Sequence, residues 1–377
     1  MAGIYIHIPW CRQVCIYCDF HFSVSAKNKP ALLKCMMREM ELQRNYLLGE
    51  KISSIYFGGG TPSLLSGDEV RLLLEKTKSL FSVQEDAEIT LEANPDDLSP
   101  VYLASLKAAG ITRLSIGVQS FFDDDLSWMN RRHNADTALA CVENSIRAGF
   151  EDINIDLIYG LPGTDTGKWE RNLKIFLNTG VFHLSAYNLT LEDKTVYAYK
   201  VRKGLMSRPD DNRAADQYEL LMDITSEAGF VHYEISNFCL HQRYSKHNTG
   251  YWLRKNYLGI GPSANSYNGT SRQWNINNNS LYIKNIENGR LHFNKEELDM
   301  ETRYNEYIMT SLRTMWGVDA DYAERAFGKV CADYLKKESN RLLKSGFLQE
   351  KGSRFILSRR GKFLADGIIA RLFITRG

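Results

Sequence analysis

The segment IYIHIPWCRQVCIYC, residues 4–18, decides the fold of this chain and the chemistry that it carries. Isoleucines alternate with Tyr5 and His7, and this period of two predicts a β-strand over Ile4–Ile8. Pro9 ends the strand. Three thiols follow within eight residues: Cys11, Cys15 and Cys18. The sequence therefore predicts a strand that leads into a cysteine-rich loop.

Three closely spaced cysteines are typical of a metal centre, because soft thiolates select zinc or iron–sulfur clusters. A cubane [4Fe–4S] cluster needs four ligands, so three cysteines leave one iron with an open position. Two other interpretations stay open here. The spacing i, i+4, i+7 also forms one helix face, and His21 completes the spacing of a Cys₃His structural zinc site. The other cysteines are expected to be inert buried thiols: Cys35, Cys141, Cys239 and Cys331.

The first half of the chain alternates strand-like and helix-like segments, which Gly and Pro separate. Strands joined by helical crossovers pair in parallel with right-handed connections. The fold class predicted is therefore α/β, with an open or partial (β/α)6 barrel. The predicted strands are Ile4–Ile8, Ser54–Phe57, Glu88–Glu92, Arg113–Gln119, Asp152–Ile158 and His183–Leu189. The predicted helices are Ala31–Leu47, Asp68–Leu80, Pro100–Ala108, Ala135–Ala148 and Gly167–Leu177.

Several predicted strands carry a polar side chain near their carboxyl ends. Glu92 and Gln119 end their strands on the polar phase, and Asp156 shares a phase with Asn154. Sites of parallel α/β sheets lie at these ends. We therefore expect these side chains to face one cavity.

The second half of the chain has a different pattern. A helix is predicted over Asp210–Ala228, followed by a loop-rich, aromatic-rich stretch over His232–Tyr282. Helices resume near Glu301, and two short strands and a last helix from Gly361 follow, which resembles a winged-helix unit. The expected divisions are residues 1–190 for the barrel, 191–300 for the extension and 301–377 for the C-terminal unit. The basic run at residues 359–362 is expected to be a solvated helix start.

Composition excludes several classes of protein. Of 377 residues, 44% are hydrophobic and 24% charged, which is ordinary globular usage rather than that of a disordered or fibrous chain. The formal net charge of +2 gives no general attraction for nucleic acid or for anionic membrane. No apolar run reaches the ~18 residues of a membrane helix, and no signal peptide is visible. We expect a cytoplasmic protein. Peripheral docking at a membrane partner is compatible with this expectation.

The cysteine spacing, with Tyr17 just before the third cysteine, resembles the radical S-adenosylmethionine (SAM) superfamily. Within it, the chain is similar to the coproporphyrinogen-dehydrogenase-like group. The segments that match are Tyr5–Pro9, Gly58–Pro62, Leu91–Pro95, Gly117–Phe121, Asn130–His133 and Asp156–Pro162. This resemblance implies a [4Fe–4S] cluster on Cys11, Cys15 and Cys18, with SAM on the open iron and an electron donor for the cluster.

The resemblance also implies roles for single residues at the SAM site. Gly59 and Gly60 would let the backbone approach the methionyl end, and Thr61 would add a hydroxyl. Arg131, rather than the adjacent Arg132, would meet the carboxylate. The remaining implied SAM residues are acceptors for the ammonium or ribose (Glu92), groups suited to hydroxyls (Gln119 and Asp156), and rings that close over the cluster and adenine (Tyr5 and Tyr17).

Two features favour the heme chaperone (HemW) subgroup. Coproporphyrinogen dehydrogenases carry a further cysteine where this chain has Phe20, and they have a longer N-terminal arm. The subgroup's His-Asn-x-x-Tyr-Trp motif is present at residues 247–252. The heme-binding residues that it implies are His247, Tyr251 and Trp252, and His241 is a second candidate.

The expected function is thus heme binding and delivery of heme to an apo-protein. The first alternative is an enzyme, an oxygen-independent coproporphyrinogen III dehydrogenase of porphyrin biosynthesis. The second alternative is a Cys₃His structural zinc protein. The residues leave open whether SAM is cleaved productively.

Overall fold

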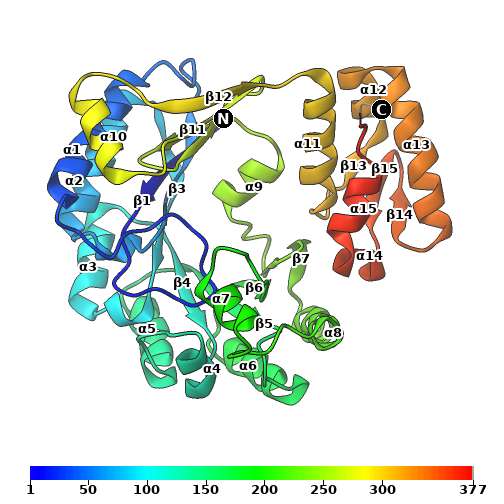
Figure 1. The fold of residues 1–377 in the computed structure, drawn as a ribbon, viewed down its shortest axis with the longest axis horizontal. Coiled ribbons are helices and arrows are strands. Elements are labelled where there is room, and N and C mark those ends of the chain that lie inside the picture. The colour runs from blue at the N-terminus through cyan, green and yellow to red at the C-terminus, as the bar shows by residue number, and fades with distance from the viewer. Residues whose placement is uncertain (376–377) are drawn as a thin grey trace.

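The six strands expected from the first half of the chain form one parallel run in the computed structural model, which describes residues 1–375 (Figure 1). Every neighbouring pair in this run is parallel, so the crossover prediction is confirmed. The strands are β1 (Ala2–Ile8), β2 (Ile52–Gly59), β3 (Val83–Ala93), β4 (Arg113–Gln119), β5 (Asp152–Tyr159) and β6 (His183–Asn188). The crossover helices are α1 (Lys29–Leu42), α2 (Gly67–Leu80), α3 (Pro100–Ala109), α5 (Ala135–Arg147) and α6 (Thr166–Asn178).

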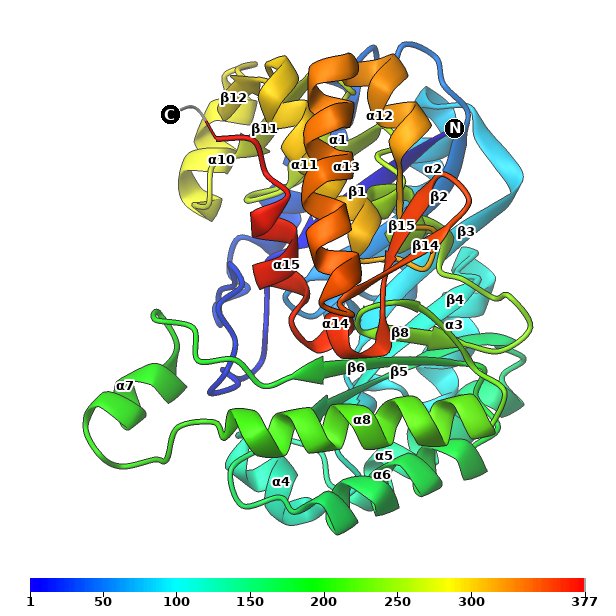
Figure 2. The ribbon, with the colours of Figure 1, turned by 90° about the vertical axis from the view of Figure 1, so that its right-hand side faces the viewer.

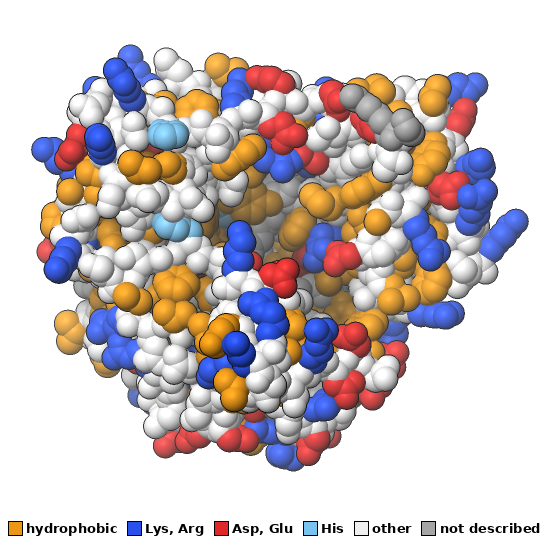
Figure 3. Space-filling model, viewed as in Figure 1, with side chains coloured by type: hydrophobic (Ala, Val, Ile, Leu, Met, Phe, Trp, Pro, Cys, Tyr) orange, Lys and Arg blue, Asp and Glu red, His pale blue; other side chains and the backbone are white. Residues whose placement is uncertain are grey.

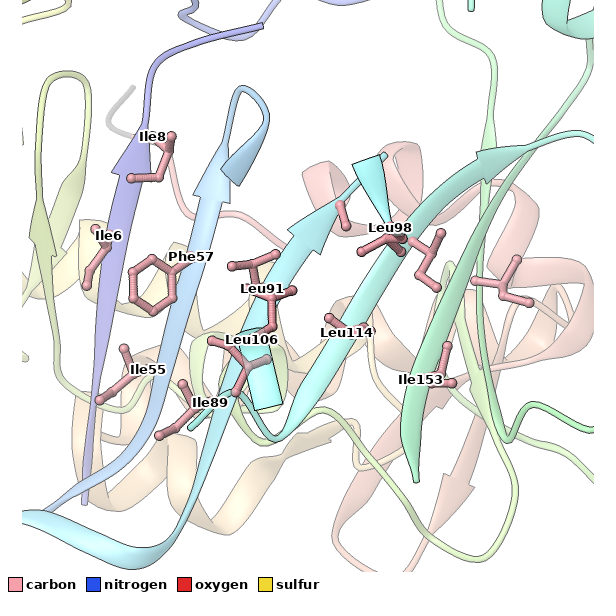
Figure 4. Packing of buried hydrophobic residues seen from close by; sticks show 14 of the residues in the cluster. Ile6, Ile8, Ile55, Phe57, Ile89, Leu91, Leu98, Leu106, Leu114 and Ile153 are labelled. Carbon is pink, nitrogen blue, oxygen red and sulfur yellow. The ribbon is translucent and has the colours of Figure 1, made fainter. Parts of the chain in front are cut away.

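One face of this sheet is apolar and packs against the helices. Ile6, Phe57, Leu91 and Leu114 point to this side from four successive strands, and each is 0% exposed (Figure 4). Fully burying such a side chain contributes about 1.5–3 kcal/mol. The opposite phase carries the polar residues, so the alternation along each strand directs them to the inside of the curved sheet.

The sheet is open, with extra strands at both ends, as expected for a partial barrel. Its order is β12-β11-β10-β9-β1-β2-β3-β4-β5-β6-β8-β7. The added strands are β7 (Val231–Glu234), β8 (Asn237–Cys239), β9 (Tyr257–Ile260), β10 (Asn265–Tyr267), β11 (Ser271–Asn275) and β12 (Phe293–Glu297). The sequence indicated mainly loops here. These strands have only three to five residues, too few to show a periodicity of their own.

The other helices of this part are shorter connections, apart from α8. They are α4 (Asp123–Trp128), α7 (Val196–Arg202), α8 (Asp211–Glu227), α9 (Lys246–Trp252) and α10 (Asn279–Glu287), with single 3₁₀ turns at Pro62–Leu64 and Pro95–Asp97. Helix α1 ends five residues before the predicted Leu47, and turns over residues 43–49 follow it, with positive φ at Leu48 and Gly49. Within residues 1–375, no helix is long and apolar enough to cross a bilayer.

The last part of the chain, here called the C-terminal unit (residues 300–372), has a hydrophobic core of its own that includes Tyr304, Ile308, Leu335 and Ile369. Its helices and short hairpin have the expected winged-helix-like arrangement and lie in front of the sheet in Figure 2. The elements are α11 (Met300–Leu312), β13 (Val318–Asp319), α12 (Ala320–Phe327), α13 (Lys329–Lys344), β14 (Leu348–Lys351), β15 (Arg354–Leu357), α14 (Arg359–Phe363) and α15 (Ala365–Arg371).

Candidate functional site

A cavity of about 990 Å³ lies between the carboxyl ends of the parallel strands and the C-terminal unit. The surface is hollowed between these two parts in Figure 3. The cavity lining includes the cysteine loop, the ends of β2 to β6, residues at α8 and after β7, and residues of the C-terminal unit, most of them on α14 and α15. The cavity therefore occupies the edge of the sheet where the sequence predicted a site.

The cysteine loop is irregular and firmly anchored. Its half-buried thiols all line the cavity: Cys11, Cys15 and Cys18. The backbone N–H of Cys11 donates to the Ser23 carbonyl, and Ile16 is buried beside Leu126 and Tyr197. Burial raises the pKa of the Cys18 thiol to about 11. Because this segment is not helical, the interpretation of one helix face of core cysteines is wrong.

The fourth zinc ligand of the alternative reading has other partners. His21 Nε2 is 3.0 Å from Asn279 Oδ1, and its carbonyl oxygen is 3.2 Å from His7 Nε2. Across residues 1–375, no three His, Cys, Asp or Glu side chains, the three loop cysteines included, are grouped closely enough to hold a single metal ion. The geometry gives no support to a Cys₃His site.

Arg131 is a cation held against the cysteine loop, and no carboxylate pairs with it within residues 1–375. Its Nη1 lies 3.3 Å from Cys15 Sγ, and its Nη2 donates to Asn94 Oδ1 at 2.6 Å and to the Gly117 carbonyl at 2.8 Å. The Nε atom is buried with no acceptor in the described part of the chain. A buried cation of this kind is costly unless an anion joins it. The donor set therefore fits an anionic cluster or a ligand carboxylate.

Two carboxylates lie on the inner face, as the sequence predicted. Burial raises the pKa of Glu92 to about 7 and that of Asp156 to about 6, and their mutual repulsion adds to the shift of Glu92. Glu92 accepts hydrogen bonds from the Tyr56 hydroxyl at 2.8 Å and from Gly59 N–H at 3.2 Å. Asn154 donates to Asp156 Oδ1 at 2.6 Å. Both carboxylates line the cavity, and the pKa of Glu92 is the one that lies nearest to neutral pH.

The Gly-Gly-Thr stretch lies where β2 meets the cysteine loop. A Cβ on Gly59 would lie 2.6 Å from the His7 ring, and one on Gly60 would lie 2.6 Å from the Trp10 carbonyl oxygen. A larger residue at either position would therefore collide with β1 or with the segment that follows it, so the packing of the chain alone already requires glycine here. The hydroxyl of Thr61 lies 3.4 Å from Cys11 Sγ. All three residues line the cavity, and their role towards SAM stays a prediction.

The remaining predicted SAM residues separate into two groups. Tyr17 and Gln119 line the cavity, and Gln119 has a left-handed backbone with φ of 68°. Tyr5 does not line it. Its hydroxyl is 3.3 Å from His7 Nδ1, and its ring stacks at 6.1 Å on Tyr56. Tyr5 therefore packs against Tyr56 and His7 and does not face the cavity itself.

The predicted heme motif lies outside the cavity, on α9. His247 is 2% exposed, and both of its ring nitrogens have partners: Nδ1 is 2.9 Å from Ser54 Oγ, and Nε2 is 2.7 Å from the Tyr251 hydroxyl. The space beside these residues is about 10 Å³, about the volume of one water probe. The His247 ring stacks at 4.9 Å on Tyr56, which in turn donates to Glu92. The motif is thus connected to the Glu92 carboxylate rather than to an open surface.

Several cavity residues carried no assignment from the sequence. Asn94, which binds Arg131, lies in the matched segment Leu91–Pro95, and its place after β3 was the available signal. Lys362 was read as part of a solvated helix start, but it lines the cavity and is half-buried. Arg313 guanidinium lies over the Trp252 ring at 5.6 Å and also lines the cavity. The last two come from the C-terminal unit, whose position no local pattern shows.

Comparison with known proteins decides the family. The model of the Radical SAM superfamily matches residues 5–174, and that of the HemN C-terminal domain matches residues 298–364. A protein of Mycobacterium tuberculosis called heme chaperone HemW is 34% identical over 375 residues, which cover 98% of this chain and 94% of that protein. The chain belongs to the HemW family of radical SAM proteins. The Bacillus subtilis heme chaperone HemW is 32% identical over 98% of both chains.

The fold also matches a solved structure. Coproporphyrinogen III oxidase (HemN) from Escherichia coli, a radical SAM enzyme, superposes on this chain with a TM-score of 0.84. The match covers 99% of this chain and 90% of the HemN chain, at 22% sequence identity. This likeness confirms the radical SAM fold with its C-terminal helical unit. Membership of the HemW family confirms the predicted subgroup and implies a [4Fe–4S] cluster and SAM as cofactors.

Proposed function

We propose that this chain binds heme in the 990 Å³ cavity and delivers it to an apo-protein, with a SAM-ligated cluster at one side of the same cavity. The observation that carries the proposal is the composition of the cavity wall. The cysteine loop and polar strand ends form one side, while Phe347, Phe363 and Ile368 form an apolar surface on the other. A flat, apolar tetrapyrrole with acidic edges fits this second side.

The cluster and SAM would occupy the side formed by the cysteine loop. Cys11, Cys15 and Cys18 are the proposed cluster ligands, and the cluster supplies one-electron chemistry to bound SAM. Arg131 would hold the SAM carboxylate, and Glu92 the ammonium or ribose. The other proposed SAM contacts are Tyr17, Gly59, Gly60, Thr61, Gln119 and Asp156, all of which line the cavity.

The pH dependence of SAM binding tests the role of Glu92. Since its pKa is raised to about 7, the carboxylate is lost as the pH falls through that value. Its pKa is higher in the folded than in the unfolded chain, so ionised Glu92 costs the empty protein stability as the pH rises. We expect the SAM-induced increase in melting temperature to be larger at pH 8 than at pH 6. In Glu92→Gln the increase should be small and alike at both pH values, and an unchanged pH dependence would contradict the role.

The sequence motif predicts direct heme ligation by His247, and His247→Ala tests this against the contacts that the residue makes in the structure. An imidazole that ligates iron must first give up its hydrogen bond to Tyr251 or to Ser54. From the contacts found, we expect His247→Ala to keep heme affinity and to weaken SAM binding severalfold, because Tyr56 loses the ring packed against it. Titrations of heme by its Soret band and of SAM by calorimetry give the two affinities. Loss of heme binding with SAM binding retained would assign His247, Tyr251 and Trp252 to heme after all.

The competing function is oxidative decarboxylation of coproporphyrinogen III. It is considered because the chain has the same fold as HemN. Phe20, at the position of the further cysteine, is 67% exposed at the cavity. The deciding experiment supplies cluster-loaded protein with coproporphyrinogen III, SAM and a low-potential reductant under anaerobic conditions. We expect no protoporphyrinogen IX beyond one turnover. Product over many turnovers would make the chain a dehydrogenase. The heme acceptor, the electron donor and the cytoplasmic location stay predictions.

A further inference from the structure

Lys362 on α14 is a cation in the cavity wall with an unusual set of partners. Its Nζ lies 2.8 Å from His232 Nδ1, and within residues 1–375 it makes no ion pair. The side chain is half-buried, and it lines the cavity on the side of the C-terminal unit. A lysine amine taken out of water is normally balanced by a carboxylate. Lys362 therefore has the charge but not the anion of a complete site.

The neighbouring histidine cannot supply that anion and instead orients the amine. His232 Nε2 is 3.0 Å from the Ile235 carbonyl oxygen, which only accepts, so this nitrogen carries the proton. Nδ1 is then the acceptor for Lys362. The ring also stacks at 4.1 Å on Phe238, which fixes its plane. Burial lowers the pKa of His232 to about 3, so the imidazole is neutral.

The other cations near this wall are differently placed. Arg313 already pairs with Asp366 at 2.8 Å and lies 3.6 Å from Glu234. Arg359 pairs with Asp223 away from the cavity lining. Arg371 lines the cavity but is exposed to water. Among the described residues of this wall, opposite the Arg131 side of the cavity, Lys362 is thus the cation that is both partly desolvated and held in one position without a carboxylate.

The surroundings indicate what kind of anion would reach it. Phe347, Phe363 and Ile368 flank Lys362 in the same wall, and Tyr218 and Ile235 lie on the side of β7 and α8. An inorganic ion would gain nothing from these side chains. A ligand with a large apolar body and a carboxylate at its edge would cover them and neutralise the amine together.

We propose that the Lys362 amine, oriented by His232, binds a propionate carboxylate of the tetrapyrrole cargo. This inference rests on the proposed heme function and assigns the edge of the cavity at which the acidic side of the ring would lie. SAM also carries a carboxylate, which the Arg131 side of the cavity accounts for. The test must therefore separate these two carboxylates.

The test compares heme with heme dimethyl ester, whose propionates carry no charge, in wild type and Lys362→Met. Cluster-loaded full-length protein is titrated with each ligand, and binding is followed by the Soret band. We expect wild type to bind heme roughly 10- to 100-fold more tightly than the ester, as for a hydrogen bond between charged groups. Lys362→Met should bind both ligands alike, at the level of the ester. Lys362→Arg should restore part of the preference.

Controls keep the outcomes distinct. Arg360→Met is the matched control, because Arg360 packs over the Phe347 ring but does not line the cavity; it should keep the full preference for heme. SAM affinity should be equal in Lys362→Met and wild type. The assignment would be overturned if Lys362→Met still preferred heme to the ester as strongly as wild type does. It would also be overturned if Lys362→Met lost affinity for SAM rather than the preference for heme. Failure of wild type to bind either ligand would instead overturn the proposed heme function.

Discussion

Cys15→Ser is expected to abolish assembly of the iron–sulfur cluster while the fold stays largely intact. A serine hydroxyl is a poor replacement for a thiolate on iron, and the cluster has only three protein ligands. The loop itself is fixed by backbone hydrogen bonds and by buried Ile16, which the substitution leaves in place. After anaerobic reconstitution, iron and sulfide content and the charge-transfer absorption should fall to background, with a small change in melting temperature.

Two further variants make this result specific. Cys35→Ala removes a buried thiol of α1 that does not line the cavity, and it should keep a full cluster. Leu91→Ala leaves a void beneath the sheet and should cost about 2–5 kcal/mol of stability. If Cys15→Ser lost stability on that scale, or retained its iron, the loop would be part of the core rather than a cluster site.

Arg131→Met is expected to weaken SAM binding roughly 100-fold or more, the scale for removing one partner of a buried charge pair. The guanidinium joins Cys15, Asn94 and Gly117 and has no carboxylate partner in the described structure, so a ligand carboxylate is the proposed balance for its charge. Calorimetric titration of cluster-loaded protein gives the affinity, and iron content shows whether the cluster is retained.

The adjacent Arg132 provides the matched control. Its side chain is 42% exposed and lies 3.6 Å from Asp96, a contact of the kind that contributes about 0–1 kcal/mol. Arg132→Met should therefore bind SAM almost as well as wild type. Equal losses of SAM affinity in the two variants would indicate a general effect of positive charge. A larger loss in Arg132→Met would assign the SAM carboxylate to Arg132 instead of Arg131.

The parallel core could be predicted from sequence because its signals are local. Strands such as β4 follow a period of two, and helices such as α3 begin at proline after a serine cap and end at Gly110 with φ of 101°. The spacing of the cysteines and the polar ends of β3 and β5 indicated the site for the same reason. Parallel strands place their carboxyl ends at one edge without any further information.

Other features depend on tertiary contacts that no local pattern contains. Strands β9 to β12 have few residues and form by pairing onto the edge at β1. The motif at residues 247–252 predicted a heme-binding role for His247, but no local pattern showed that its imidazole would be buried against the inner face of β2, beside Ser54 and Tyr56. Lys362 reaches the cavity only because the C-terminal unit lies over the strand ends.

Transfer of heme to an acceptor tests the central claim most directly. Cluster-containing protein is loaded with one equivalent of heme, separated from free heme and mixed with an apo-hemoprotein, whose spectrum reports arrival. We predict stable loading and a transfer rate that rises with the concentration of the acceptor, as expected for handover through a complex. Failure of the cluster-containing protein to retain heme would contradict the account. So would release at one fixed rate, the same with the acceptor as with a simple heme scavenger.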